Sequence, residues 1–281
     1  MIPSFFLSGA HSLLEQTLLS KSFLAVMGFT LLCERLWPVD RSQPILSDGF
    51  FQDSAWFLLA LLMRGTVVAF YADALKKIYD GHFSFLTLQS LQMLPEVIRF
   101  SIAILAADFL GWFQHWLKHA VPWFWQFHAV HHAQTQLNAF TDFRFHLMEY
   151  LISKPIVMLP MLVLGVEAPT FILWAVFSGW YTTFYHANIR AGLGPLRYFV
   201  VTPQSHRVHH SIEERHADKN FGVLFSFWDR IFRTQYEGPM EYPRTGIRDT
   251  VFPYGKGRTF SAWFLSPLKQ LIYPFQTTPK K

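Results

Sequence analysis

The sequence predicts an all-α fold, a helical bundle of four to five membrane spans with a histidine-rich helical cap on its cytoplasmic side. Three observations support this prediction. Of the 281 residues, 51% are hydrophobic and only 15% are charged, whereas a soluble domain carries about 25% charged residues. Apolar stretches of helical length recur along the chain. Ten of the 13 histidines lie between positions 115 and 210.

The composition also excludes several classes of protein. The 16 prolines and 15 glycines are dispersed, which argues against a disordered or collagen-like chain. Cys33 is the single cysteine, which excludes disulfide scaffolds and zinc sites built on cysteine pairs. The net charge of +5 is modest and indicates a preference for the inner leaflet of a membrane rather than for nucleic acid. Met1 to Ser22 has no basic start, so we expect no cleaved signal peptide.

Five apolar stretches predict the membrane helices. The fifth has no Asp, Glu, Lys or Arg and reaches the roughly 20 residues that a bilayer core requires. Charged residues interrupt the second and third stretches, and two prolines lie in the fourth. The alternative, core helices of a soluble protein, is disfavoured by the low charge of the whole chain. The stretches are Ser12–Trp37, Asp53–Lys76, Glu96–Lys118, Tyr150–Val166 and Ala168–Ile189.

The connection between the fourth and fifth stretches sets the topology. Gly165 to Pro169 leaves room only for a tight reversal, so the two stretches form a hairpin and residues 114–149 and 187–281 lie on the same side. Residues 187–281 are rich in Lys and Arg, which places them in the cytoplasm. We therefore expect an integral membrane protein, divided into N-terminal membrane helices (1–95), a segment that contains the membrane hairpin and most of the histidines (96–235) and a cytoplasmic tail (236–281).

The histidines form spaced groups. One group has the pattern HxxxH and two have the pattern HxxHH, and residues at i, i+3 and i+4 share one face of a helix. A tetrahedral zinc uses three or four protein ligands, so nine imidazoles suit two metal ions with open coordination positions. The nine predicted ligands are His115, His119, His128, His131, His132, His186, His206, His209 and His210.

The ligand type leaves the metal open, because imidazole binds zinc, copper, iron and nickel. Two iron ions are favoured by the lipid setting, where a dinuclear site suits O2 activation and attack on an unactivated C–H bond; zinc is a possible substitute in a purified sample. Two rival functions remain. A zinc-dependent membrane hydrolase would need fewer histidines and a carboxylate base, and a non-catalytic lipid- or metal-binding membrane protein would need no O2.

Polar residues near the histidines are candidates for orienting the ligand rings. Asp108 lies two helical turns before His115, where it can accept a ring N–H. His146 and Glu149 are three residues apart and can pair, with His146 a ligand as the alternative. Asn188 can ligate through water or cap a helix. His216 is expected at a solvated surface, and His11 and His82 are expected to have no role. The predicted orienting residues are Asp108, His146, Glu149, Asn188, Asn220 and Asp229.

The order HxxxH, HxxHH, membrane hairpin, lone histidine, HxxHH resembles the fatty acid hydroxylase/sterol desaturase superfamily. The likeness covers roughly residues 34 to 235 and includes Asp108, Asn220-Phe221-Gly222 and Trp228-Asp229-Arg230. It is greatest to the bacterial sterol-desaturase-like and alkylglycerol-monooxygenase-like branch. Two departures stand out: many members have a further histidine where this chain has Ile189-Arg190, and Arg-x-His-Pro where it has His146-Leu147.

The resemblance implies a membrane-bound oxidoreductase, a di-iron monooxygenase of lipid biosynthesis. Such an enzyme uses O2 and two external electrons to hydroxylate or desaturate a fatty acyl chain, a sterol or an ether lipid. The chain has no GxGxxG motif, no P-loop and no haem-binding cysteine motif. We therefore expect a partner, a ferredoxin or a cytochrome with its NAD(P)H reductase, to supply the electrons.

Overall fold

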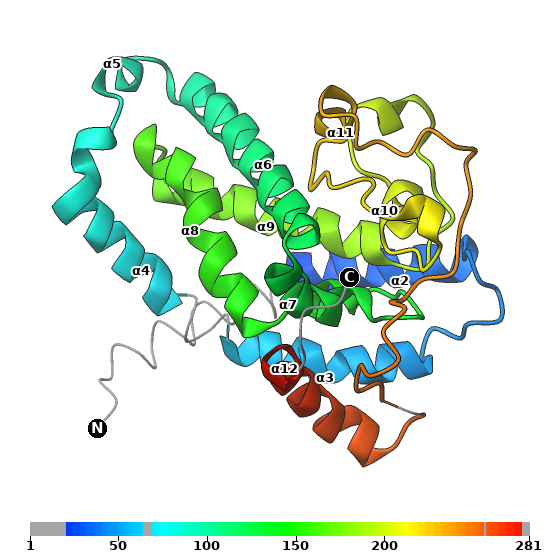
Figure 1. The fold of residues 1–281 in the computed structure, drawn as a ribbon. Helices are drawn as coiled ribbons and strands as arrows, with labels where there is room; N and C mark the ends of the chain where they lie inside the picture. Colours follow the sequence, from blue (N-terminus) through cyan, green and yellow to red (C-terminus); the bar gives the residue numbers. More distant parts are fainter. Residues whose placement is uncertain (1–20, 64–68, 256, 277–281) are drawn as a thin grey trace, which may run out of the picture.

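The computed structural model describes residues 21–63, 69–255 and 257–276 (Figure 1). Over these ranges the chain is helical, with isolated β-bridges and no strand, which confirms the predicted all-α class. The α-helices are α2 (Lys21–Leu36), α3 (Asp48–Met63), α4 (Ala69–Ile78), α5 (Gln89–Gln92), α6 (Glu96–Ala120), α7 (Pro122–His132), α8 (Leu147–Val163), α9 (Ala168–His186), α10 (Pro203–His209), α11 (Phe227–Ile231) and α12 (Ser266–Gln276).

Short 3-10 and π-helical turns connect these helices. The π-helical turns are η2 (Tyr79–Phe83) and η7 (Ser261–Leu265), and the 3-10 turns are η3 (Ser84–Leu86), η4 (Thr141–Phe143), η5 (Gly194–Tyr198) and η6 (Glu214–His216). Three of the predicted stretches correspond to α6, α8 and α9 with shifted ends, and Ser12–Trp37 corresponds to α2, although residues 12–20 lie outside the described ranges. The stretch Asp53–Lys76 corresponds to α3 and α4, and residues 64–68 between them lie outside the described ranges.

The expected membrane spans are not reproduced. In the three described ranges, no helix combines the length and the apolar character needed to cross a bilayer. The physical reasons differ between helices. The 25-residue α6 carries several charged side chains, Arg99 and Asp108 among them, and α8 has 17 residues. The uncharged α9 has 19 residues, but tryptophans, tyrosines and threonines replace aliphatic residues along it.

A sharp corner joins α6 to α7. Val121 alone separates the two helices, and Pro122 occupies the first turn of α7, where its fixed φ favours the helix and its missing N–H costs nothing. The HxxxH motif therefore ends one helix immediately before the next begins. α10 starts in a similar way: Pro203 lies in its first turn, and Thr202 and Ser205 form a reciprocal capping box. The histidines therefore lie in the last turns of α6, α7 and α10.

The long helices α6 and α8 lie side by side (Figure 1), and the long helices α6 and α9 each carry histidines near their last turn. α6 packs along α8, and the small residues Ala103 and Ala107 of α6 form a buried cluster with Met161 of α8 and with Leu164, which follows α8. α10 packs against α9. Since α8 and α9 are joined by the tight turn at Gly165, whose φ is +62°, the end of α9 reaches the ends of α6 and α10. The hairpin thus delivers His186 to the other histidines.

The C-terminal segment covers the outer face of α7. Ala129 and Val130 of α7 are fully buried against Trp56 of α3 and Tyr273 of α12. α12, red in Figure 1, lies beneath α7 and beside α3. Residues 236–281, expected as a tail, therefore include a helix that packs on a histidine-bearing helix. The opposite face of α7 is left for the histidines.

Two buried carboxylates attach the loop at residues 221–228 to α6. Asp108 accepts hydrogen bonds from the backbone N–H groups of Leu224 and Phe225 at 2.9 and 3.1 Å, and from the indole of Trp228 at 2.9 Å. Asp229 accepts from the backbone of the same loop and from the indole of Trp112. These bonds fix the loop on the helix that carries the HxxxH motif.

We expect Asp108→Ala to lower the free energy of unfolding by about 2–3 kcal/mol, because three buried donors lose their acceptor. Asp108→Asn keeps one acceptor oxygen and should cost less. Denaturant unfolding followed by tryptophan fluorescence measures both. A loss below about 0.5 kcal/mol for the alanine variant would show that the loop does not depend on this carboxylate.

Candidate metal centre

All nine predicted histidines meet in two adjacent clusters. In each cluster the ring nitrogens that can bind a metal lie within 4.8 Å of one another. Every one of the nine side chains is at least nine-tenths buried. The five-histidine cluster is His115, His119, His128, His132 and His209, and the four-histidine cluster is His131, His186, His206 and His210.

The two HxxHH motifs are each divided between the clusters. On α7, His128 and His132 join the five-histidine cluster, while His131 joins the four-histidine cluster. On α10 the division is reversed, because the first and last histidines belong to the four-histidine cluster and His209 belongs to the other. In both motifs the histidines at i and i+4 belong to the same cluster, and the histidine at i+3 belongs to the other cluster. The motifs therefore connect the clusters and do not build one cluster each.

Backbone carbonyl groups orient four of the rings through Nδ1. A carbonyl oxygen only accepts hydrogen bonds, so in each case Nδ1 carries the proton and Nε2 presents a lone pair. This is the arrangement in which an imidazole binds a metal through Nε2. The pairs are His115 with Phe221 (2.9 Å), His209 with Lys219 (2.8 Å), His131 with Arg144 (3.2 Å) and His186 with Thr182 (2.7 Å).

A carboxylate orients a fifth ring. Glu149 Oε2 accepts a hydrogen bond from His128 Nδ1 at 2.9 Å and lies 2.9 Å from the ammonium of Lys118. Burial alone would raise the pKa of Glu149, but Lys118 and His128 together lower it to about 2. The carboxylate is therefore ionised, and the Nε2 of His128 also presents a lone pair.

Two Nε2 pairs test whether these residues fit metal ions. Nε2 of His115 lies 3.1 Å from Nε2 of His128 in one cluster, and Nε2 of His131 lies 3.0 Å from Nε2 of His186 in the other. In both pairs the proton is on Nδ1, so two lone pairs face each other at hydrogen-bond distance. Such a contact is repulsive unless a cation lies between the rings. The donor set and its tautomers therefore fit one metal ion in each cluster.

Burial keeps the rings neutral, as ligands must be. It lowers the pKa of His132, His206 and His210 well below the usual value, and the neighbouring histidines lower it further. Burial likewise lowers the pKa of His209 to about 3. Neutral imidazole is therefore the form present at physiological pH.

We expect the metal-free protein to lose stability in acid. In the unfolded chain these histidines titrate near pH 6.5, so between about pH 6.5 and 3 the unfolded state binds more protons than the folded state. The free energy of unfolding thus rises with pH through this window and falls as the pH drops. The midpoint of thermal unfolding should fall by at least about 10 °C between pH 7.5 and 5. An unchanged midpoint over that range would contradict neutral buried rings.

Several predicted orienting residues have other partners. Asp108 bonds the loop at residues 221–228, as described above, and His146 caps α8 by accepting from the N–H of Met148 while its Nε2 donates to the carbonyl of Leu271. The expected pairing of His146 with Glu149 is wrong, because Glu149 bonds to His128. His216, expected at a solvated surface, is 1% exposed and bonds to Ser211 and Glu241.

The remaining predicted residues shape the surrounding loops. Asn188 bonds to the backbone of Asp40 through both ends of its amide. Asn220, in the left-handed region with φ +60°, donates to the carbonyl of Ser205 and accepts from the N–H of Tyr236. Asp229 bonds to the N–H of Phe221, whose carbonyl orients His115. Asn220 and Asp229 thus act on the backbone beside the rings. His82 is exposed and lies in η2, and His11 is outside the described residues.

The carbonyl groups of Thr182, Arg144, Lys219 and Phe221 were not among the predicted orienting groups. A backbone carbonyl has no residue type, so no sequence signal could have indicated it. Asp142, whose carboxylate lies 3.5 Å from Nδ1 of His186, was also missed. Asp142 and His186 are 44 residues apart in the sequence, so no local spacing indicated this pair.

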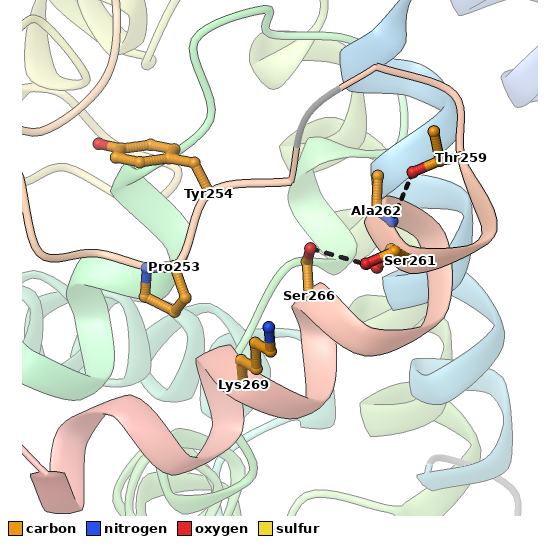
Figure 2. Close-up of a pocket in the computed structure, with 7 residues that line it drawn as sticks. All are labelled: Pro253, Tyr254, Thr259, Ser261, Ala262, Ser266 and Lys269. Carbon is orange, nitrogen blue, oxygen red and sulfur yellow. Dashed lines mark hydrogen bonds between the residues drawn. The ribbon is translucent and has the colours of Figure 1, made fainter.

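A separate cavity of about 290 Å³ lies near the start of α12 (Figure 2). It is lined by Pro253, Tyr254, Thr259, Ser261, Ala262, Ser266 and Lys269. None of these seven residues is a histidine or an acid. The cavity is therefore not part of the candidate metal centre.

Comparison with known proteins agrees with the site. Residues 100–234 match the family model for fatty acid hydroxylases, and this segment holds all nine histidines. This segment, just under half of the chain, is similar to a fatty acid hydroxylase domain. The resemblance of the histidine motifs to this superfamily is thereby confirmed. No solved structure matches the chain.

The chain is also similar to curated proteins that are named for different lipids. The chain is 24% identical to the ornithine lipid hydroxylase OlsE of Rhizobium tropici over 220 residues, which is 77% of this chain and 66% of that protein. It is 30% identical to the alkylglycerol monooxygenase of Homo sapiens over 47% of this chain and 29% of that protein. It is 26% identical to human cholesterol 25-hydroxylase over 51% of this chain and 53% of that protein. The chain thus spans about two thirds or less of each relative.

Proposed function

We propose that this protein is a membrane-bound, O2-dependent lipid hydroxylase that works with two iron ions, one in each histidine cluster. The reaction is R–H + O2 + 2 e⁻ + 2 H⁺ → R–OH + H2O, in which the C–H bond is oxidised and O2 is reduced. The observation that carries the proposal is the pair of adjacent clusters with inward-facing Nε2 lone pairs. Two such ions together supply O2 activation near a C–H bond.

The protein's own residues hold and insulate the centre. The carbonyl groups of residues 144, 182, 219 and 221 fix the ring orientations, so little reorganisation is needed when metal binds. The side chains around the clusters are buried, which excludes bulk water from the reacting groups. Nine imidazoles would hold the ions, and the carboxylates of Glu149, Asp142 and Asp218 lie beside three of the rings.

The names of the relatives favour hydroxylation over desaturation. Each is named a hydroxylase or a monooxygenase, and the printed substrates are an ornithine lipid, an alkylglycerol and cholesterol. A lipid substrate also agrees with the exposed apolar face of α6, where Val97, Ile98, Ile102 and Leu105 are each more than one third exposed. We propose that this face contacts membrane lipid. The inner membrane of a bacterium, with the centre on the cytoplasmic side, is our proposed location.

The two electrons require a partner. The chain has no motif for a nicotinamide, flavin or haem cofactor. We propose a ferredoxin or a cytochrome with its NAD(P)H reductase as the donor.

The test combines metal analysis with lipid mass spectrometry. The protein is purified without oxygen and its iron content is measured. In a second experiment, a host with a competent reductase is grown with and without the protein, and the lipids of the two cultures are compared. We expect about two iron ions per chain and an O2-dependent lipid product heavier by 16 mass units. His131→Ala should abolish the product, whereas His82→Ala, an exposed histidine outside both clusters, should not.

Two results would overturn the proposal in favour of its rivals. About one zinc ion per chain with activity in the absence of O2 would indicate a hydrolase. Unchanged lipids with iron bound and a competent reductase present would indicate a non-catalytic protein.

A further inference from the structure

We propose that η7 and α12 form an interfacial helix whose exposed apolar side lies in the headgroup region of an anionic membrane leaflet. The inference rests on the membrane location proposed above and not on the metal centre. It concerns a surface outside both histidine clusters, on the C-terminal segment that covers the outer face of α7.

Large apolar side chains are exposed along one side of this segment. Each of them is at least 40% exposed, although the opposite side of the same segment is buried. Positions 264, 268 and 272 are four residues apart, so they follow one face of a helix. The apolar stripe consists of Phe260, Phe264, Leu265, Leu268, Ile272 and Phe275.

The buried side of the segment fixes the direction in which the stripe faces. Gln270 accepts hydrogen bonds from the indole of Trp56 at 3.2 Å and from the guanidinium of Arg144 at 2.9 Å. The indole of Trp263 donates to Ser54 Oγ at 2.8 Å. The segment cannot rotate to bury the stripe without breaking these bonds. The stripe is therefore held outward by the same contacts that attach the segment to α3.

The charge of the C-terminal region favours an anionic surface. From position 250 to the end, the sequence has no Asp or Glu. Lys269 is exposed and borders the stripe, because Ile272 is its i+3 neighbour. A helix with Phe and Leu on one side and cations at its edge binds in the interface of a membrane that contains anionic lipids. The cations of this region are Lys256, Arg258, Lys269, Lys280 and Lys281.

The stripe continues into aromatic side chains at the start of α7. Phe275 contacts Phe127 with ring centroids 5.5 Å apart, and Phe127 contacts Trp123 at 4.9 Å. Trp123 and Trp116 are both exposed, and tryptophan is enriched where a bilayer meets water. Trp116 lies about five helical turns after Ile98 and so on the same face of α6. The stripe is therefore near the end of the α6 face assigned to lipid above, as expected for a helix at the level of the headgroups.

The test places a fluorescent label on the stripe of the full chain. The native Cys33 is buried, so Leu268→Cys supplies the site that the reagent reaches. The labelled protein is reconstituted in vesicles of phosphatidylcholine with a minority of phosphatidylglycerol, whose acyl chains carry bromine as a quencher. We expect at least about twofold quenching for a side chain in the interface. A label at Glu214→Cys, an exposed position in η6, should not be quenched.

The charge preference is tested in the same labelled protein. Bromine on the anionic lipid alone should quench more than the same amount on the neutral lipid, because one cation near an anionic surface confers up to about a fivefold preference. Lys269→Gln should lower this ratio. Lys76→Gln, an exposed lysine on α4, should leave it unchanged.

Four results would overturn the inference. Quenching of the label at position 268 by iodide in water, as strong as at position 214, would show a face open to solvent. Protection from both iodide and bromine would show that a protein, either a second copy or a partner, covers the stripe. Equal quenching by the two lipids, or an unchanged ratio in Lys269→Gln, would contradict the anionic preference.

A third label separates this inference from the proposed function. Ile98→Cys, on the exposed face of α6, reports contact with the membrane itself. Quenching there without quenching at Leu268→Cys would overturn the inference and leave the membrane location intact. Failure of the hydroxylase reaction would appear instead as missing iron or missing product while the quenching at Leu268→Cys persisted.

Discussion

His210→Ala should reduce the iron content from about two ions per chain to about one and lower lipid hydroxylation more than 100-fold. The variant leaves three imidazoles in the four-histidine cluster, His131, His186 and His206. Changes to groups that merely orient a ligand typically cost about 10–100-fold in metal affinity or activity, so removal of a ligand should cost more. Metal analysis of the anaerobically purified variant and product formation measure the two effects.

The neighbouring residue provides the matched variant. His209→Ala removes a ligand from the five-histidine cluster, which keeps four imidazoles. Four protein ligands still satisfy a tetrahedral ion, so this variant should retain close to two metal ions although its activity falls. His82→Ala should keep both metal and activity. His209 and His210 are adjacent in the sequence but belong to different clusters. Equal metal loss in the two variants would therefore contradict the division into two clusters.

The sequence predicted which histidines meet but not how they divide. The i, i+3, i+4 spacing places three rings on one face of a helix. That face is broad enough for its rings to reach two different metal clusters. The division of His128, His131 and His132 depends on how α7 and α10 face each other. The orientation of α7 depends on its contacts with α3 and α12. The HxxHH motif contains no information about those contacts.

The orienting groups were predicted less well, for a related reason. Asp108 is on the same helix as His115, as its spacing indicates, but the loop at residues 221–228 supplies donors that occupy its carboxylate. That loop comes from more than 100 positions further along the chain. The groups that do orient the rings are mainly backbone carbonyls, which any residue type can provide. Glu149 was identified as a candidate, but its partner is His128 and not His146.

The largest effect expected away from the histidines is at Asp53, which is fully buried in α3. It accepts hydrogen bonds from Arg144 (3.0 Å), Gln134 (2.8 Å), Asn138 (2.9 Å) and Thr141 (2.9 Å). Asp53→Ala should lower the free energy of unfolding by about 3–5 kcal/mol, because it leaves the buried guanidinium without its counter-charge. Proteins of this kind have about 5–15 kcal/mol of stability in total. Denaturant unfolding of the metal-free protein measures the loss.

The consequence should extend to the four-histidine cluster. Arg144 donates through Nε to the carbonyl of Val130, and its own carbonyl orients His131. Movement of the unpaired guanidinium would disturb that ring, so Asp53→Ala should also weaken iron binding. Asp73→Ala, which breaks an exposed pair with Lys77, should cost less than about 1 kcal/mol and leave the iron content unchanged. If the two variants lost similar stability, the buried ion pair would not support the fold as the structure indicates.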